Sequence, residues 1–171
     1  MTIGATFTGK LYRALNPVWA AQPLSGEGAA RHGGRFNPRG TPALYCSLDP
    51  LSALREANQV GDLQPTTLVA FDAAIGNVFD SQFSEALKQF GLLPSDLADP
   101  DWRDQMLRNG EARTQAFARE LIGAGYAALR VRSFARGAGV EAVNLVLWRW
   151  SSEPPHRLTL IDDENRLGRP L

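Results

Sequence analysis

Short stretches in which apolar residues dominate, or alternate with polar ones, recur along the chain, and both patterns are typical of β-strands. In GKLYRAL, Leu11 and Arg13 alternate with Tyr12 and Ala14, whereas ALYCSL is short and apolar, as expected of a buried strand. The pattern predicts strands at residues 9–15, 43–48, 66–73, 77–80, 126–133, 142–150 and 156–162.

A helix is predicted directly after the second of these strands. Asp49 is a suitable N-cap and Pro50 suits the first helical position. The helix should continue to about Val60 and end near Gly61. This helix carries the acidic residue Glu56.

The other helices are expected in the middle of the chain. Residues 81–124 predict several helices, interrupted at 91–101 and 109–110. Grouped strands with inserted helices favour an α+β fold over a regular alternation of strands and helices. Because a chain of 171 residues is usually one folding unit, we expect a compact single domain over residues 1–171.

Residues 16–42 carry no clear helix or strand pattern. Structureless loops of this length are uncommon and are usually functional or disordered. Trp19, Leu24 and Phe36 supply apolar anchors, which favours an ordered loop.

The second half of this loop combines positive charge with glycine. Arg31, Arg35 and Arg39 surround the pair Gly33 and Gly34. Paired glycines let a backbone approach a ligand closely, and an arginine beside them can bind a phosphate with two parallel hydrogen bonds. A surface turn with solvated arginines explains the same composition, and the composition alone leaves both interpretations open.

Composition narrows the functional classes. Lysine plus arginine (18) equals aspartate plus glutamate (18), which argues against a protein whose main task is to coat nucleic acid. Cys46 is the single cysteine, so an internal disulfide is excluded and a reducing compartment is favoured. The sequence has neither a membrane-spanning apolar run nor a secretory signal, which predicts a cytoplasmic protein. Two histidines and one cysteine, far apart, give no metal-ligand spacing.

Glu56 shares one face of its predicted helix with small apolar residues. Ala53, Glu56, Ala57 and Val60 fall at positions i, i+3, i+4 and i+7 of that helix. A carboxylate among such residues lies either at the rim of the packing or inside a working site, because unpaired burial is unfavourable. Both alternatives are open.

Three further polar residues lie in predicted strands. Tyr45 belongs either to the core or to a wall against which a flat ring can stack. Ser133 follows the core-facing row of its strand, where it can line a pocket or simply start a turn. Asn144 has the same ambiguity. Cys46 lacks a partner base, so a cysteine nucleophile is not favoured.

Taken in order, these residues resemble the RES-domain family, the toxins of toxin–antitoxin pairs whose antitoxin is an Xre-like helix-turn-helix protein. The family's signature is approximately G-G-R-W-N-x-x-G-x-x-x-x-Y followed by a helix with A-x-x-E. The matching residues are Gly33, Gly34, Arg35, Asn37, Gly40, Tyr45, Ala53 and Glu56, preceded by Tyr12 and Arg13 and followed by Ser133 and Asn144. Phe36 replaces the usual tryptophan, which keeps an aromatic ring but removes the indole N–H. Residues 75–120 contain no matching motif.

The resemblance implies an α+β fold with a mixed sheet similar to that of ADP-ribosyltransferases, and NAD as a substrate whose nicotinamide–ribose bond is broken. It implies a catalytic set of Glu56, Arg35, Tyr45 and Ser133. It also implies an NAD-binding set of Arg13, Arg31, Gly34, Arg35, Tyr45 and Asn144, without a metal.

Several points stay open under the resemblance. Water, phosphate or a specific protein can accept the ADP-ribose, and the last case would make the chain an ADP-ribosyltransferase. A non-catalytic nucleotide-binding or interaction module is the alternative from another class. The expected partner is an Xre-like helix-turn-helix antitoxin that covers the active site, with no direct binding to nucleic acid or membrane.

Overall fold

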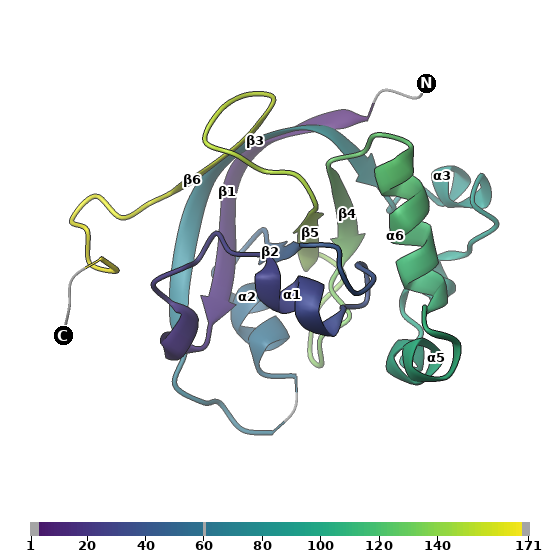
Figure 1. Cartoon of the computed structure of the whole chain (residues 1–171), viewed down its shortest axis with the longest axis horizontal. Coiled ribbons are helices and arrows are strands. Elements are labelled where there is room, and N and C mark those ends of the chain that lie inside the picture. Colours follow the sequence, from purple (N-terminus) through teal and green to yellow (C-terminus); the bar gives the residue numbers. More distant parts are fainter. Residues whose placement is uncertain (1–3, 60, 169–171) are drawn as a thin grey trace.

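The computed structural model describes residues 4–59 and 61–168 and has a mixed α+β architecture with a sheet at its core (Figure 1), which confirms the expected fold class. The strands are β1 (Ala5–Leu15), β2 (Leu44–Ser47), β3 (Thr67–Asp80), β4 (Ala128–Arg132), β5 (Val143–Leu147) and β6 (His156–Leu160). The helices are α1 (Glu27–His32), α2 (Pro50–Ala57), α3 (Ser84–Lys88), α4 (Pro94–Leu97), α5 (Trp102–Asn109) and α6 (Arg113–Gly123).

The sheet closes on itself. Its strand order is β1-β2-β5-β4-β3-β6, and β1 also pairs with β3, so five strands form a ring and β6 extends beyond β3. The pairing of β1 with β3 is long and antiparallel, whereas β1 and β2 are joined only through Tyr12 and Ser47. The ring therefore has one weak seam, between β1 and β2.

Strand β3 is continuous, which corrects the prediction of two strands at 66–73 and 77–80. The sequence signal for a break comes from Gly76 and Asn77, and Asn77 does adopt a positive φ of 54°. Its side chain accepts a hydrogen bond from the Gly4 N–H at 2.6 Å and donates one to the Gly125 carbonyl at 2.6 Å. The strand bends at this residue without ending, because β1 pairs along both halves.

Helix α2 begins as predicted. The Asp49 carboxylate accepts hydrogen bonds from the Ser52 N–H at 2.9 Å and the Ser52 hydroxyl at 2.5 Å, and Pro50 occupies the first turn. The helix ends at Ala57, earlier than predicted, because Asn58 leaves the helical conformation. The predicted end at Val60 lies outside the described residues.

The loop at 16–42 is more regular than predicted. A 3₁₀ helix spans Pro17–Trp19, where the Asn16 side chain accepts from the Val18 N–H at 3.0 Å. Helix α1 then ends at Gly33, whose φ of 73° favours glycine. Both elements are too short to create a recognisable periodic pattern.

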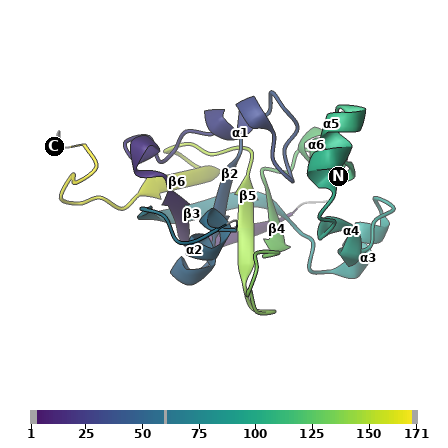
Figure 2. The ribbon, with the colours of Figure 1, turned by 90° about the horizontal axis from the view of Figure 1, so that it is seen from below.

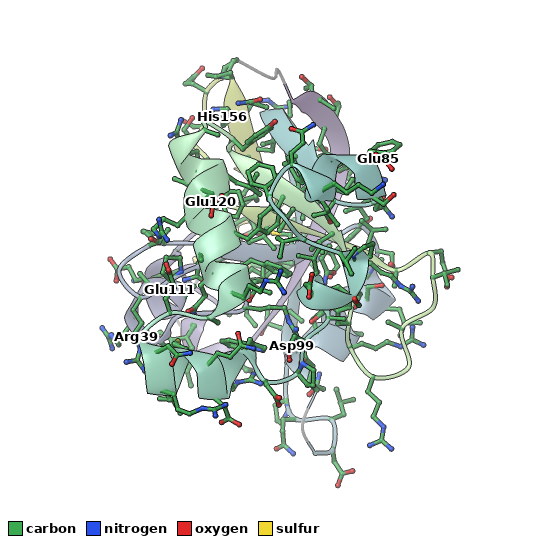
Figure 3. All side chains as sticks on the ribbon, turned by 90° about the vertical axis from the view of Figure 1, so that its right-hand side faces the viewer. Arg39, Glu85, Asp99, Glu111, Glu120 and His156 are labelled. Carbon is green, nitrogen blue, oxygen red and sulfur yellow. The ribbon has the colours of Figure 1, made fainter. Side chains whose placement is uncertain are left out.

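Two apolar clusters hold the fold together. The first lies among the strands and includes Leu11, Phe71 and Leu145, all fully buried. The second packs α6 and neighbouring helices against β4 and β5, as Figures 2 and 3 show from two sides. In this cluster, Phe79 makes edge-to-face contacts with Phe90, Phe117 and Tyr126, at centroid distances of 5.2–5.7 Å.

The region 81–124 is helical, as predicted, although α4 lies inside the stretch 91–101 that was expected to interrupt the helices. Asp96 stabilises this short helix by accepting from the Leu93 N–H at 2.7 Å. None of the helices in the described parts of the chain is long and apolar enough to cross a bilayer.

Candidate functional site

Glu56 lies at the centre of a hydrogen-bonded group assembled from three elements. Its Oε1 atom accepts from the Ser133 hydroxyl at 2.5 Å and from Asn144 Nδ2 at 2.6 Å. Its Oε2 atom accepts from Gln59 Nε2 at 2.5 Å. The structure thus brings together three residues that the sequence singled out separately, because the Glu56 side chain on α2 reaches Ser133, directly after β4, and Asn144, near the start of β5.

Ser47 fixes the orientation of this group. Its hydroxyl donates to Asn144 Oδ1 at 2.7 Å, so the amide of Asn144 is held from one side and directed at Glu56 from the other. Ser133 is only 3% exposed. Its hydroxyl also accepts from the Ala135 N–H at 3.3 Å, so it joins Glu56 to the loop after β4. The carboxylate is therefore held in one orientation before any ligand arrives.

Two cavities meet at Glu56. One measures about 200 Å³ and lies at the weak seam between β1 and β2, lined by Arg13, Ala14 and residues 45–47. The other measures about 250 Å³ and contains Arg35 in its wall. Glu56, Tyr45 and Asn144 line both cavities.

Arg35 lies in the wall of the larger of these two cavities. Its Nη1 donates to the carbonyls of Leu97 at 3.1 Å and Asp99 at 2.7 Å. Its guanidinium lies 5.3 Å from the ring centroid of Phe134 and 6.0 Å from that of Trp102. Burial lowers the pKa of Arg35 and the charge of Glu56 acts in the opposite direction. Arginine remains cationic, so a positive charge faces this cavity.

Arg13 is arranged in a similar way on β1. Its Nη1 donates to the carbonyls of Pro23 at 2.7 Å and Ser25 at 3.4 Å, which ties the following loop to the sheet. Burial lowers its pKa. Arg31, by contrast, lines neither cavity at Glu56 but a separate one of about 260 Å³, which Arg13 also borders.

Tyr45 is half-buried and lines the two cavities that meet at Glu56. Its hydroxyl accepts from the Phe36 N–H at 3.0 Å and donates to Asn37 Oδ1 at 2.6 Å, while the ring lines both cavities. Burial raises its pKa, so the phenol stays protonated. A side chain at Gly34 would overlap the Tyr45 hydroxyl, so this glycine is needed for the packing of Tyr45 as well as for the shape of the cavity.

Sequence reasoning missed the supports of this turn. Gln115 is fully buried, and its Nε2 donates to the carbonyls of Gly34 at 2.9 Å and Asn37 at 3.2 Å. Nothing in the helix pattern around Gln115 indicated this contact. Ser47 could have been found, because it shares a strand face with Tyr45.

Phe36 and Cys46 belong to the packing. Phe36 is 3% exposed, and its carbonyl accepts from Trp148 Nε1 at 2.9 Å. Cys46 is 1% exposed, and burial raises its pKa to about 12, so the thiol is not an ionised nucleophile near neutral pH. Within the described residues, His, Cys, Asp and Glu form no group of three or more that could hold a metal ion.

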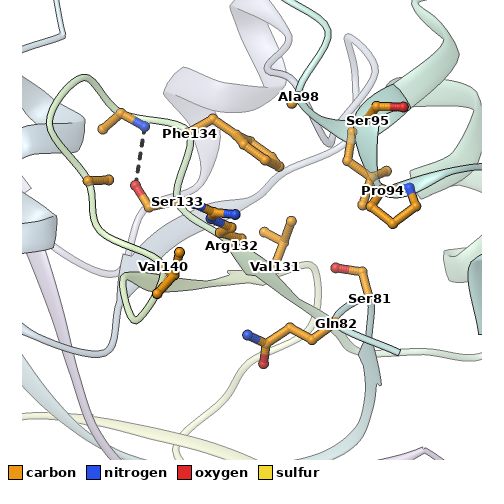
Figure 4. Close-up of a pocket in the computed structure, with 13 residues that line it drawn as sticks. Ser81, Gln82, Pro94, Ser95, Ala98, Val131, Arg132, Ser133, Phe134 and Val140 are labelled. Carbon is orange, nitrogen blue, oxygen red and sulfur yellow. Dashed lines mark hydrogen bonds between the residues drawn. The ribbon is translucent and has the colours of Figure 1, made fainter. Parts of the chain in front are cut away.

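A larger cavity of about 760 Å³ adjoins the site (Figure 4). It shares Val131, Arg132 and Phe134 with the cavity that holds Arg35, and Ser133 lies in its wall. Ser133 thus separates this open space from the Glu56 carboxylate.

Comparisons with known proteins identify the fold and the family of the chain. Among solved structures, a match is the crystal structure of the M. tuberculosis MbcT–MbcA toxin–antitoxin complex, with a TM-score of 0.68 and 22% sequence identity over 94% of this chain and 85% of the other. At that identity, the match shows a shared fold. No curated protein matches the chain. The model of the RES domain matches residues 10–168, almost the whole chain. The chain therefore belongs to the RES domain family.

Proposed function

We propose that this chain is the toxin of a toxin–antitoxin pair and that it consumes NAD by cleaving the bond between nicotinamide and ribose. One observation supports this above the others. The Glu56 carboxylate is held by Ser133 and Asn144 where two cavities meet, and an arginine lines each cavity. Ligand sites usually measure about 300–1,000 Å³. Each of these cavities is smaller, so a dinucleotide has to extend across Glu56.

The carboxylate suits the charge that develops in this reaction. As the bond from C1 of ribose to the nicotinamide nitrogen breaks, its electron pair neutralises the pyridinium and leaves an oxocarbenium-like sugar. A fixed anion stabilises that cation without reorganising. The acceptor oxygen then bonds to C1 and loses its proton. Nicotinamide leaves as a neutral molecule, so no strong general acid is needed.

Each remaining site residue has a role in this proposal. Tyr45 lines both cavities, and its hydroxyl bonds to Phe36 and Asn37 fix the ring as a wall against which nicotinamide can stack. Arg35 uses Nη1 for protein carbonyls, and its charge is available for the diphosphate. Arg13 flanks the second cavity and can share that task. Ser133 and Asn144 hold Glu56 and border the nicotinamide end.

A depletion assay with NAD and the purified chain, run with and without phosphate, tests this function. Glu56→Gln keeps the size of the side chain and removes its charge, so we expect NAD consumption to fall on the order of 10²–10³-fold. Glu120→Gln is the matched control, because Glu120 is an exposed carboxylate on α6 (Figure 3). A folded Glu56→Gln variant that consumes NAD at the native rate would refute the assignment.

The products identify the acceptor. ADP-ribose indicates transfer to water, and its 1″-phosphate indicates transfer to phosphate. Radiolabel from NAD that appears on one protein band of a cell lysate indicates an ADP-ribosyltransferase instead. NAD that persists under all conditions would leave only the non-catalytic alternative.

The proposed partner is a cognate Xre-like helix-turn-helix antitoxin that covers the cleft at Glu56. This rests on family membership, and MbcT itself was crystallised with MbcA as a toxin–antitoxin complex. Co-expression with the product of the neighbouring reading frame should restore cellular NAD. If that product binds the chain but NAD still falls, the binding surface lies away from the cleft.

A further inference from the structure

The cavity of about 260 Å³ beside β1 has no role in the site described so far. Its walls include Arg13 and Leu15 from β1, Trp19 from the 3₁₀ helix and Arg31 from α1. We propose that this cavity binds the adenylate half of NAD, with Trp19 against the purine and Arg31 and Arg13 against the phosphate. The inference rests on the proposed function, since it places the part of the substrate that does not react.

Arg13 connects this cavity to the reacting centre. It lines both the 200 Å³ cavity that contains Glu56 and the 260 Å³ cavity that contains Trp19. Its Nη1 already binds the Pro23 and Ser25 carbonyls, which fixes the position of the guanidinium. A ligand that extends from Glu56 past Arg13 therefore meets a second fixed positive charge, so Arg13 takes the phosphate of the adenylate half and Arg35 takes the phosphate of the nicotinamide half.

Trp19 provides the flat surface that a purine needs. The side chain is 63% exposed although it is large and apolar, and neighbouring Leu15 is only 7% exposed. The 3₁₀ helix holds it there through the Asn16 cap. An exposed indole beside a buried floor favours stacking with a base, a contact that is insensitive to which base is present.

The charge of the cavity favours a phosphate. Arg31 and Arg13 face a single carboxylate, that of Glu27. Arg31 makes no salt bridge among residues 4–59 and 61–168, so its guanidinium is available to a ligand. An arginine binds a terminal phosphate with parallel hydrogen bonds.

The 760 Å³ cavity on the other side of Glu56 is less suited to adenylate. Arg132 is the one charged residue in its wall. The aromatic ring there belongs to Phe134, which already lies against the Arg35 guanidinium. This larger space lacks the combination of an unoccupied aromatic face and a second cation.

Calorimetric titration of the full chain with AMP, at low ionic strength, tests the proposal without NAD turnover. We expect Trp19→Ala and Arg31→Gln each to raise the Kd for AMP about tenfold. Val18→Ala and Arg39→Gln are the matched controls. Val18 is a neighbouring exposed apolar residue, and Arg39 is an exposed arginine whose side chain donates to the His32 carbonyl. Both controls should stay within about twofold of the wild type. Thermal unfolding of each variant verifies that it is folded.

Two results would overturn this subsite directly: no binding of AMP, or unchanged affinity for AMP in Trp19→Ala and Arg31→Gln. A third would place AMP elsewhere: a loss of AMP affinity in Arg103→Gln instead, because Arg103 lines the 250 Å³ cavity. The assays also separate this inference from the function. If AMP binding depends on Trp19 while NAD is never consumed, the subsite stands and the proposed reaction fails. If the Trp19→Ala chain consumes NAD with an unchanged KM, the reaction stands and the subsite fails.

Discussion

Arg13 and Arg35 line different cavities that meet at Glu56, and each performs the same structural task. Each uses Nη1 to bind two backbone carbonyls, so Arg13 ties residues 23–25 to β1 and Arg35 ties residues 97–99 to the turn before β2. They differ in the group that opposes the effect of burial on the guanidinium pKa. For Arg35 it is first Glu56, and for Arg13 it is the Cys46 thiol. A partly buried arginine beside a cavity therefore need not bind a ligand. Its hydrogen bonds to the protein decide which of its N–H groups a ligand can still reach.

The largest difference should appear when Arg35 is removed. Arg35→Ala deletes a cationic side chain from the wall of the 250 Å³ cavity that Glu56 also lines, and a charged hydrogen bond contributes about 1.5–3 kcal/mol. The KM for NAD should rise roughly 10- to 150-fold with a smaller change in kcat. Steady-state kinetics measure this, with Arg39→Ala as the exposed control. An unchanged KM would mean that Arg35 does not hold the diphosphate and that another arginine, in the cavity on the other side of Glu56, does.

Arg13 should contribute more visibly to stability. Arg13→Gln leaves the Pro23 and Ser25 carbonyls without their donor, which should lower the free energy of unfolding by about 2 kcal/mol. Urea denaturation measures the change. Lys10→Gln on the same strand is the control, because its exposed ion pair with Asp72 contributes at most about 1 kcal/mol. Equal stability of the two variants would show that Arg13 does not hold the loop.

Tyr45 lines both cavities, and a variant without its hydroxyl shows whether that group serves stability or substrate binding. Tyr45→Phe removes the hydroxyl bonds to Phe36 and Asn37 but keeps the ring. We expect a loss of about 1–2 kcal/mol in unfolding free energy and a KM for NAD within about twofold of the wild type. Tyr12→Phe serves as the control, since no hydrogen bond of the Tyr12 hydroxyl occurs in the described parts of the chain. A large rise in KM would instead assign the hydroxyl to substrate binding.

The smallest effect concerns the thiol beside Arg13. Burial raises the pKa of Cys46 from 9.0 to about 12, so the unfolded chain loses its proton first as the pH rises. This contribution to stability is complete below pH 9 and is lost progressively towards pH 12. By pH 10 the loss should reach about 1 kcal/mol. Denaturation of the wild type and of Cys46→Ala at pH 7 and pH 10 measures this contribution as the difference between the two proteins in how much unfolding free energy they lose. An identical loss in both proteins would show that the thiol is not shielded.

Local patterns predicted the elements, while the site depended on their pairing. Asp49 identified the start of α2 because a cap involves only neighbouring residues. Glu56, Ser133 and Asn144 were each recognised as candidates from a helix face or a strand end. Their contact follows from the pairing of β2 with β5 and of β5 with β4, which brings Asn144 and Ser133 within reach of Glu56 and which periodicity does not encode.

The failures have the same physical origin. The bend at Asn77 resembles a strand end locally, yet pairing with β1 carries β3 through it. Gln115 looks like an ordinary polar helix residue, and only the fold reveals that it holds the carbonyls of Gly34 and Asn37. The site roles assigned through family resemblance remain predictions.

The closed ring of strands has a consequence for the order in which the protein matures on the ribosome. Glu56 lies in the first third of the chain, whereas Asn144 is 88 residues further along and β2 needs β5 for its main pairing. A nascent chain that has not yet released residue 147 lacks both the strand that supports β2 and the amide that orients the carboxylate. Activity should therefore appear only near the end of synthesis, which leaves the translating cell an interval in which the growing chain is harmless.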